Sequence, residues 1–358
     1  MPIVAFDRNS VGGTIVGASG PETPAPPVAP PLHSPSWHSD LKHALRDPLQ
    51  LITALELPAH LLQPAREAAH TFPLFAPWPY IARMTKGDPA DPLLRQVLPL
   101  ADELTDQPGF TSDAVGDSAA LLSPGLLQKY HGRALLITTG ACAIHCRYCF
   151  RREYPYSDSP KSPGDWQPAL DQIAADATID EVILSGGDPL TLTDGHLADL
   201  ATRIAAIPHV QRLRIHTRLP IIIPSRVTNE LIAWLRGTRL TPIFVIHANH
   251  ANEFDDTTAT ALARLSDSGI PLLNQSVLLR GINDTAQALI NLSRRLINLR
   301  VTPYYLHQLD RVRGASHFEV PHCLGLSLIE EMRRALPGYA VPRYVQELPG
   351  EEHKIVLA

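Results

Sequence analysis

The 358-residue chain has little of several features that define other classes of protein. Its formal net charge of -5 gives no electrostatic basis for binding nucleic acid. No apolar run approaches the roughly 18 residues that a membrane-spanning helix needs. The N-terminal run MPIVAFDRNS lacks a basic region followed by an apolar one, so we see no signal peptide. We therefore expect a cytoplasmic protein that binds neither nucleic acid nor membrane.

Cysteine is also scarce, at 4 residues, but three of the four lie within GACAIHCRYCFRR. The cytoplasm keeps thiols reduced, so clustered cysteines there indicate metal binding or catalysis rather than a disulfide framework. Cys323 lies far away in sequence and is predicted to be an ordinary thiol.

Proline, by contrast, is abundant at 34 residues and unevenly spread. The run SGPETPAPPVAPPLHSPSW is typical of an extended linker without a core, so we predict a disordered tail over residues 1–37. Residues 38–125 mix short helical patterns with prolines, which predicts a small, mostly helical N-terminal region.

Short apolar runs then alternate with amphipathic stretches. The runs lie at 133–139, 180–187, 212–217, 242–249, 271–281 and 302–310. This alternation indicates an α/β fold with parallel strands covered by helices. Six units without a dinucleotide-binding fingerprint favour a partial (β/α)6 barrel over residues 126–320, with a doubly wound sheet as the alternative. Residues 321–358 form a separate C-terminal segment.

Polar residues occur where these apolar runs end. They are Ser185, Gly186, Gly187, Asp188, His216, His247, Gln275 and Asp310. In α/β barrels the carboxyl ends of the strands carry the active site. Strand ends that simply meet solvent are the alternative interpretation, and the sequence alone leaves the two about equal.

The clustered cysteines are Cys142, Cys146 and Cys149, on a loop after the first predicted strand. Three thiolates can bind three irons of a [4Fe–4S] cluster and leave the fourth open. A zinc ion is the alternative, and it needs a fourth ligand such as His145, a distant residue or water. Plain core cysteines are a third reading. The spacing favours the cluster.

CAIHCRYC resembles the Cys-x3-Cys-x2-Cys signature of the radical S-adenosylmethionine (SAM) enzymes, whose partial (β/α)6 barrel agrees with the six units counted above. In that family the open iron binds the methionyl amino and carboxylate groups of SAM. SGGDPL resembles the family's glycine-rich motif, although alone it is typical of a tight turn. The resemblance implies SAM contacts from Ser185, Gly186, Gly187, Asp188, His247 and Gln275.

A narrower resemblance covers about Asp88 to the C-terminus. CRYCFRR, SGGDPL, IHANHANE, NQSVLLRGIND, PYYLHQLD and LPGEEHK follow the order found in lysine 2,3-aminomutases. PGLLQKYHGRALL resembles the branch that makes (R)-β-lysine from L-lysine, which a separate ligase attaches to elongation factor P. The resemblance implies a functional link to elongation factor P and an electron donor of flavodoxin or ferredoxin type.

The aminomutases also use pyridoxal 5′-phosphate (PLP), and Lys354 matches the lysine that carries it. From the sequence alone, a lysine four residues from the end is usually solvated. Tyr130 and Arg133 match positions that contact PLP. The resemblance therefore predicts that the C-terminal segment folds back over the barrel mouth.

Substrate contacts are implied in the same way. Arg151 matches the arginine that binds the substrate carboxylate, a group that guanidinium can grip with two hydrogen bonds. Asp310 and Glu347 match two carboxylates that bind the distal ammonium. Glu347 departs from the family, which has aspartate there. Two other functions stay open: a free amino-acid 2,3-aminomutase of metabolism, and a non-catalytic zinc-binding module.

Overall fold

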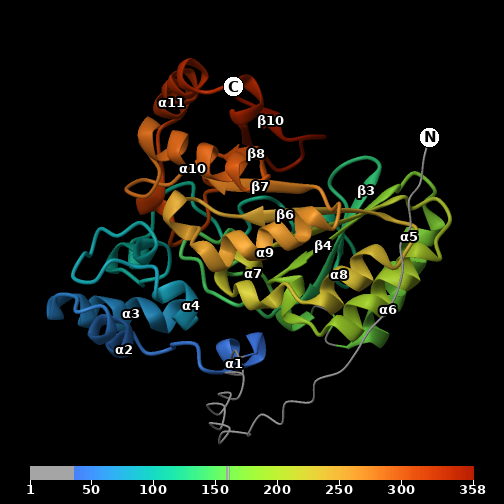
Figure 1. Cartoon of the computed structure of the whole chain (residues 1–358), viewed down its shortest axis with the longest axis horizontal. Coiled ribbons are helices and arrows are strands. Elements are labelled where there is room, and N and C mark those ends of the chain that lie inside the picture. The colour runs from blue at the N-terminus through green and yellow to red at the C-terminus, as the bar shows by residue number, and fades with distance from the viewer. Residues whose placement is uncertain (1–35, 159, 161) are drawn as a thin grey trace, which may run out of the picture. The chain divides into compact units, whose positions relative to one another are not determined.

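The computed structural model describes residues 36–158, 160 and 162–358 (Figure 1). Residues 1–35 of the predicted tail lie outside the described residues. Trp37 is the buried first residue of helix α1 (Trp37–Lys42). Residues 36 and 37, which composition assigns to the tail, therefore belong to the start of a packed helix.

A ten-stranded mixed sheet forms the centre of the described structure, with its strands in the same order as in the sequence. β3 to β9 pair in parallel, whereas β1 and β2 at one edge and β10 at the other pair antiparallel. The strands are β1 (Leu121–Ser123), β2 (Leu126–Leu127), β3 (Arg133–Thr139), β4 (Glu181–Gly186), β5 (Arg212–Thr217), β6 (Thr241–His247), β7 (Leu272–Val277), β8 (Thr302–His307), β9 (Arg343–Gln346) and β10 (Ile355–Val356).

Strands β3 to β8 coincide with the six apolar runs that the sequence predicts to be strands. Most residues of β4 are buried irrespective of the face they point to, as expected for a parallel strand covered on both sides. The expectation of parallel strands alone was incomplete. A further parallel strand, β9, follows β8, and short antiparallel strands extend both edges.

Helices alternate with these strands. The α-helices after α1 are α2 (Pro48–Ala54), α3 (Leu62–Thr71), α4 (Trp78–Ile81), α5 (Gln167–Ala175), α6 (Asp194–Ala205), α7 (Leu219–Ile222), α8 (Asn229–Arg236), α9 (Asp256–Asp267), α10 (Ala286–Asn298) and α11 (His322–Ala335). Thr193, Thr228 and Thr285 cap α6, α8 and α10, because each side chain accepts a hydrogen bond from a backbone N–H of the first turn. None of the described helices combines the length and apolarity required to cross a membrane.

The N-terminal helices share a core with the sheet and its helices. Leu51 and Ile81, from α2 and α4, belong to the same apolar cluster as Leu219 and Ile221 of α7. α4 contacts α7, which directly follows β5. In Figure 1 the helices α2, α3 and α4 lie together, on the far side of α7 from β7 and β8. This packing brings the N-terminal region to the carboxyl end of β5.

The C-terminal segment returns to the sheet. β9 pairs in parallel with β8, and β10 folds back antiparallel onto β9 with Ile355 opposite Gln346. Leu357 N donates to Tyr344 O at 2.8 Å, which fixes the last residues beside β9. This turn places Lys354, just before β10, near Glu347, just after β9.

Candidate active site

The predicted cluster ligands share one loop between β3 and the 3-10 helix η5 (Tyr156–Asp158). Cys142, Cys146 and Cys149 are all free thiols. Burial raises the pKa of Cys149 to about 11, and the charge of Cys146 adds to the rise. Among the described residues, no three His, Cys, Asp or Glu side chains gather closely enough to hold a single metal ion. Three thiols on one short loop match the donor type of a [4Fe–4S] cluster, whose usual ligands are thiolates.

Buried ion pairs anchor this loop to the N-terminal region. Arg147 Nη2 lies 2.5 Å from Glu103 Oε2, and Arg152 Nη2 lies 2.8 Å from the same oxygen. His145, the candidate fourth ligand of a zinc site, instead bonds through Nδ1 to Pro73 O at 2.8 Å and stacks on Phe72. Segments far apart in the sequence therefore hold the cysteine loop in place.

The glycines of SGGDPL allow β4 to approach that loop closely. A Cβ on Gly187 would lie 2.2 Å from Ala141 O, and a Cβ on Gly186 would lie 2.5 Å from Thr139 O. Gly186 also has a φ of +127°, which side chains other than glycine rarely adopt. Only glycine fits at either position, so this motif fixes the loop against the end of β4.

The Asp188 side chain is hydrogen-bonded to neighbouring residues of the protein. Its carboxylate accepts hydrogen bonds from Thr217 Oγ1 at 2.7 Å, from Arg218 N at 2.7 Å and from Leu190 N at 3.0 Å. Burial raises its pKa to about 6 despite these bonds. The predicted contact to a SAM ammonium would have to share these acceptor oxygens. Through these hydrogen bonds Asp188 connects the end of β4 to the start of α7.

The other predicted SAM-binding residues lie at neighbouring strand ends. Ser185 is in β4, His247 ends β6 and lies in register with Gln275 of β7. His247 Nε2 lies 3.4 Å from His216 Nδ1 of β5. Burial and the nearby charge of Arg218 lower the pKa of His247 to about 4, so its imidazole is neutral at pH 7. The parallel register gathers these side chains along one edge.

A chain of ion pairs joins the predicted substrate-binding residues to the predicted PLP lysine. Lys354 Nζ pairs with Glu347 Oε2, and Lys129 Nζ lies 3.0 Å from Glu347 Oε1. Lys129 Nζ also lies 2.7 Å from Asp117 Oδ1, and Asp117 Oδ2 lies 2.7 Å from Arg151 Nε. Burial opposes ionisation of Glu347, but the charges of Lys354 and Lys129 lower its pKa to about 2.

Asp310 lies beside this chain. Burial raises its pKa to about 7, the charge of Glu347 adds to the rise, and Lys354 opposes it. Its Oδ1 atom is buried and has no hydrogen-bond partner among the described residues. An unpaired buried carboxyl oxygen next to Glu347 is suited to accept from a ligand.

The predicted PLP-binding residues lie next to Lys354. Its Nζ is 5.8 Å from the centre of the Tyr130 ring, and the Arg133 guanidinium carbon is 4.8 Å from the same ring. Arg133 Nε is buried and no partner for it exists in the part of the chain that the structure describes. A buried, unpaired guanidinium N–H beside a lysine fits the phosphate and aldehyde ends of PLP.

Four residues of this region were not found from the sequence: Asp117, Lys129, Arg218 and Glu253. Glu253 lies within the quoted run IHANHANE, and Arg218 follows β5 directly, so position at a strand end is the signal that could have found them. Lys129 lies within the quoted run PGLLQKYHGRALL, directly before the predicted PLP contact Tyr130, whereas no pattern in the sequence marks Asp117.

The chain resembles known proteins along most of its length. The model of the Radical SAM superfamily matches residues 136–292. L-lysine 2,3-aminomutase of Escherichia coli (strain K12) is 46% identical over 330 residues, covering 91% of this chain and 96% of that protein. The enzyme of the same name from Haemophilus influenzae is 44% identical over 323 residues, covering 90% and 96%.

More distant relatives share less of their length. L-lysine 2,3-aminomutase of Clostridium subterminale is 36% identical over 273 residues, which covers 76% of this chain and 65% of that protein. Among solved structures, a radical SAM methyltransferase from Sphaerobacter thermophilus covers 62% of this chain and 68% of its own, at 17% identity and a TM-score of 0.42.

The prediction of an enzyme is confirmed by the aminomutase relatives, and the alternative of a non-catalytic zinc-binding module is wrong. The resemblance stated from CAIHCRYC and the later motifs is confirmed as well. This chain belongs to the L-lysine 2,3-aminomutase family of the radical SAM superfamily and is an isomerase.

Proposed function

We propose that this enzyme is a lysine 2,3-aminomutase that moves the amino group of L-lysine from C2 to C3, using a [4Fe–4S] cluster, SAM and PLP. The observation that carries the proposal is the 46% identity to L-lysine 2,3-aminomutase of Escherichia coli, which extends over 96% of that protein. The arrangement of charged residues around Lys354 supports the same substrate.

Cys142, Cys146 and Cys149 would hold the cluster, and the glycines of SGGDPL with His247 and Gln275 would hold SAM beside it. Bound together, the cluster and SAM supply a carbon radical that removes a hydrogen atom from an unreactive C–H bond. The protein's part is to keep that bond within reach and to exclude water, because a stray radical would be quenched. The neutral imidazole of His247 can donate or accept a hydrogen bond without adding charge.

Lys354 would carry PLP, with Arg133 facing the phosphate and Tyr130 beside the ring. PLP, when bound there, would supply a conjugated system able to delocalise an unpaired electron. Lys354 must first lose a proton from Nζ, and its partner Glu347, whose pKa is lowered to about 2, remains charged while it does so.

The charges favour a diamine substrate. A Lys354 linked to PLP would no longer offer an ammonium to Glu347, which would keep Lys129 as its cation. Asp310 contributes an unpaired buried oxygen nearby. The distal ammonium of L-lysine would replace the lost charge, while Arg151 would bind the substrate carboxylate.

The test is anaerobic incubation of reconstituted enzyme with L-lysine, SAM, PLP and dithionite, followed by chiral chromatography. We expect β-lysine from the wild type and none from Cys146→Ala or Lys354→Ala. Absence of β-lysine from wild-type enzyme with an intact, reducible cluster would overturn the substrate assignment but not the radical chemistry.

We further infer that the product is (R)-β-lysine for modification of elongation factor P, with an electron donor of flavodoxin or ferredoxin type in the cytoplasm. The motif run PGLLQKYHGRALL supports this branch. Deletion of the gene should then abolish the mass added to elongation factor P. An unchanged mass, or preference for another amino acid, would favour a free amino-acid aminomutase of metabolism. The six strands β3 to β8 would form the partial (β/α)6 barrel of this enzyme.

A further inference from the structure

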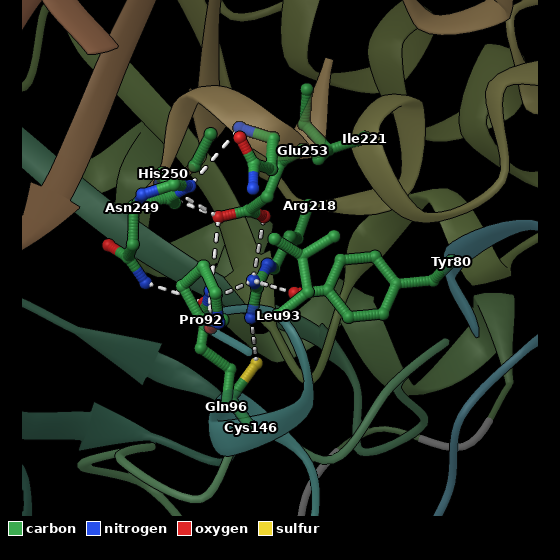
Figure 2. A network of polar contacts seen from close by, with 12 residues as sticks. Tyr80, Pro92, Leu93, Gln96, Cys146, Arg218, Ile221, Asn249, His250 and Glu253 are labelled. Atoms are coloured by element: carbon green, nitrogen blue, oxygen red, sulfur yellow. Dashed lines mark hydrogen bonds and ion pairs between the residues drawn. The ribbon is translucent and has the colours of Figure 1, made fainter. Parts of the chain in front are cut away.

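Arg218 bridges a cluster cysteine and a buried acid. Its Nη1 atom donates to Cys146 Sγ at 2.8 Å. Its Nη2 atom donates to Glu253 Oε2 at 2.8 Å, to Gln96 Oε1 at 2.6 Å and to Tyr80 OH at 3.3 Å. Figure 2 shows the guanidinium between the sulfur on one side and the carboxylate on the other.

The surroundings of Arg218 leave it little freedom. Its backbone N–H donates to Asp188 at 2.7 Å. Asn249 fixes two of these acceptors, since its backbone N–H donates to Glu253 Oε1 at 2.8 Å and its Nδ2 donates to Gln96 Oε1 at 3.0 Å. Glu253 and Gln96 are fully buried, and Arg218 is 5% exposed. The donor is therefore held towards the sulfur before any cluster binds.

We propose that Arg218 is a positioning residue that donates a hydrogen bond to the Cys146 thiolate of the cluster and raises the reduction potential of that cluster, with Glu253 offsetting its charge. This inference rests on the proposed function, because it assumes that Cys146 ligates the cluster.

The direction of the effect follows from electrostatics. Reduction adds one electron to the cluster, taken from an external one-electron donor, and no bond or proton is transferred. An N–H donor and a positive charge beside a thiolate stabilise the state with more negative charge, which is the reduced state. The low dielectric of a buried site strengthens this interaction. Loss of the donor should therefore make the cluster harder to reduce.

Arg83 offers a matched control from the same neighbourhood. Its guanidinium lies over the ring of Tyr80 at 5.2 Å and donates to the backbone carbonyls of Glu253 and Ile221. No hydrogen bond joins it to a cysteine among the described residues. A substitution at Arg83 disturbs the same packing, so it separates a structural defect from an effect through sulfur.

The experiment is a dithionite titration of the reconstituted cluster monitored by electron paramagnetic resonance, without SAM, PLP or lysine. The variants are Arg218→Met combined with Glu253→Gln, which removes the N–H donor and both charges of the buried pair together, Arg218→Lys and the control Arg83→Lys. At the wild-type midpoint potential we expect the ratio of reduced to oxidised cluster in the double variant to fall about tenfold, which is about 59 mV for one electron. In Arg218→Lys the ratio should fall by less, because a single ammonium nitrogen replaces the two guanidinium nitrogens that bond Cys146 and Glu253 separately. In Arg83→Lys the ratio should match the wild type.

A double variant that assembles the cluster and keeps the wild-type potential would overturn the inference. If the double variant binds no iron, the single variant Arg218→Lys decides the question. A lowered ratio of reduced to oxidised cluster supports the role of the two guanidinium nitrogens, and an unchanged ratio contradicts it. An equal fall in Arg83→Lys would mean that the effect is structural, which also overturns the proposal. Failure of the wild type to assemble a [4Fe–4S] cluster would instead remove the proposed function itself.

Discussion

Asp310 gives the site a pH dependence that can be tested. Its pKa is raised to about 7, mainly by burial, so its carboxyl group is neutral below that pH and charged above it. Only the charged form attracts a substrate ammonium, and below the pKa the charged fraction falls about tenfold per pH unit. We expect the KM for L-lysine to fall as pH rises through about 7. In Asp310→Asn the KM should be higher and should lose this pH dependence.

A stability measurement provides an independent control for Asp310. Between its unfolded pKa of 3.8 and its folded pKa of about 7, the native state holds a proton that the unfolded chain releases. This group therefore lowers the stability of the fold as pH rises through that window. Asp310→Asn should gain thermal stability relative to wild type at pH 8 but not at pH 3. An equal shift at both pH values would contradict the raised pKa.

Glu347 bridges two lysines at the predicted substrate site. Its two oxygens bind Lys129 and Lys354 separately, and the carboxylate of aspartate, one methylene nearer the backbone, would not reach the same position between the two cations. We expect Glu347→Asp to change the configuration of the β-lysine product or to reduce kcat/KM at least about tenfold, a loss of about 1.4 kcal/mol. Chiral chromatography and steady-state rates measure this. Unchanged configuration and kinetics would remove Glu347 as the cause of any stereochemical difference.

At the scale of elements, the contact between β4 and the cysteine loop depends on Gly187. A methyl group there would lie 2.2 Å from Ala141 O, and a backbone atom cannot move aside without shifting the loop. We expect Gly187→Ala to bind less than half of the wild-type iron and to lose about 1–3 kcal/mol of stability, as overpacked sites do. Iron analysis and thermal unfolding measure the two effects.

Gly195 in α6 is the matched control, because an added Cβ would meet nothing within 4 Å. Gly195→Ala should keep full iron content and gain up to about 1 kcal/mol from better helix propensity. Wild-type iron content in Gly187→Ala would show that the loop does not need this close approach.

Elements with a strong local pattern were the ones that the sequence could predict. β3 to β8 are apolar runs of 6 or 7 residues between amphipathic helices, so their periodicity identifies them. β9 has only the 4 residues RYVQ, and β10 has 2, so neither carries a period. Their place in the sheet depends on pairing with β8 and with each other.

Long-range ion pairs could not be predicted from the sequence, because their partners lie far apart along the chain. Lys129 bonds Glu347 across 218 positions, and Arg218 bonds Cys146 across 72. Charged residues at such separations look like ordinary solvated side chains until the fold brings them together. The cysteine spacing and the family motifs could be recognised because they are local, whereas the partners that hold them are not.

At the scale of the whole molecule, two distant segments support the two predicted cofactor sites. The cysteine loop is anchored by Glu103, which pairs with both Arg147 and Arg152. Lys354 is positioned by β10, whose flanking Leu357 packs against the cluster around Tyr344. Among the described residues, no hydrogen bond or ion pair joins Glu103 to β10 or to Leu357, so damage to one support should spare the other site.

We therefore expect one variant to lose the cluster and keep PLP, and a second variant to lose PLP and keep the cluster. Glu103→Gln leaves two buried guanidinium groups without their shared acid, which costs about 3–5 kcal/mol for a broken buried pair. At a temperature where it stays folded, it should lose cluster iron and keep PLP. Removal of Leu357 and Ala358 should release PLP, followed by its absorbance after gel filtration, and keep cluster iron. Loss of both cofactors in each variant would mean that the two sites fold as one unit and that the ion-pair chain from Arg151 to Lys354 couples them.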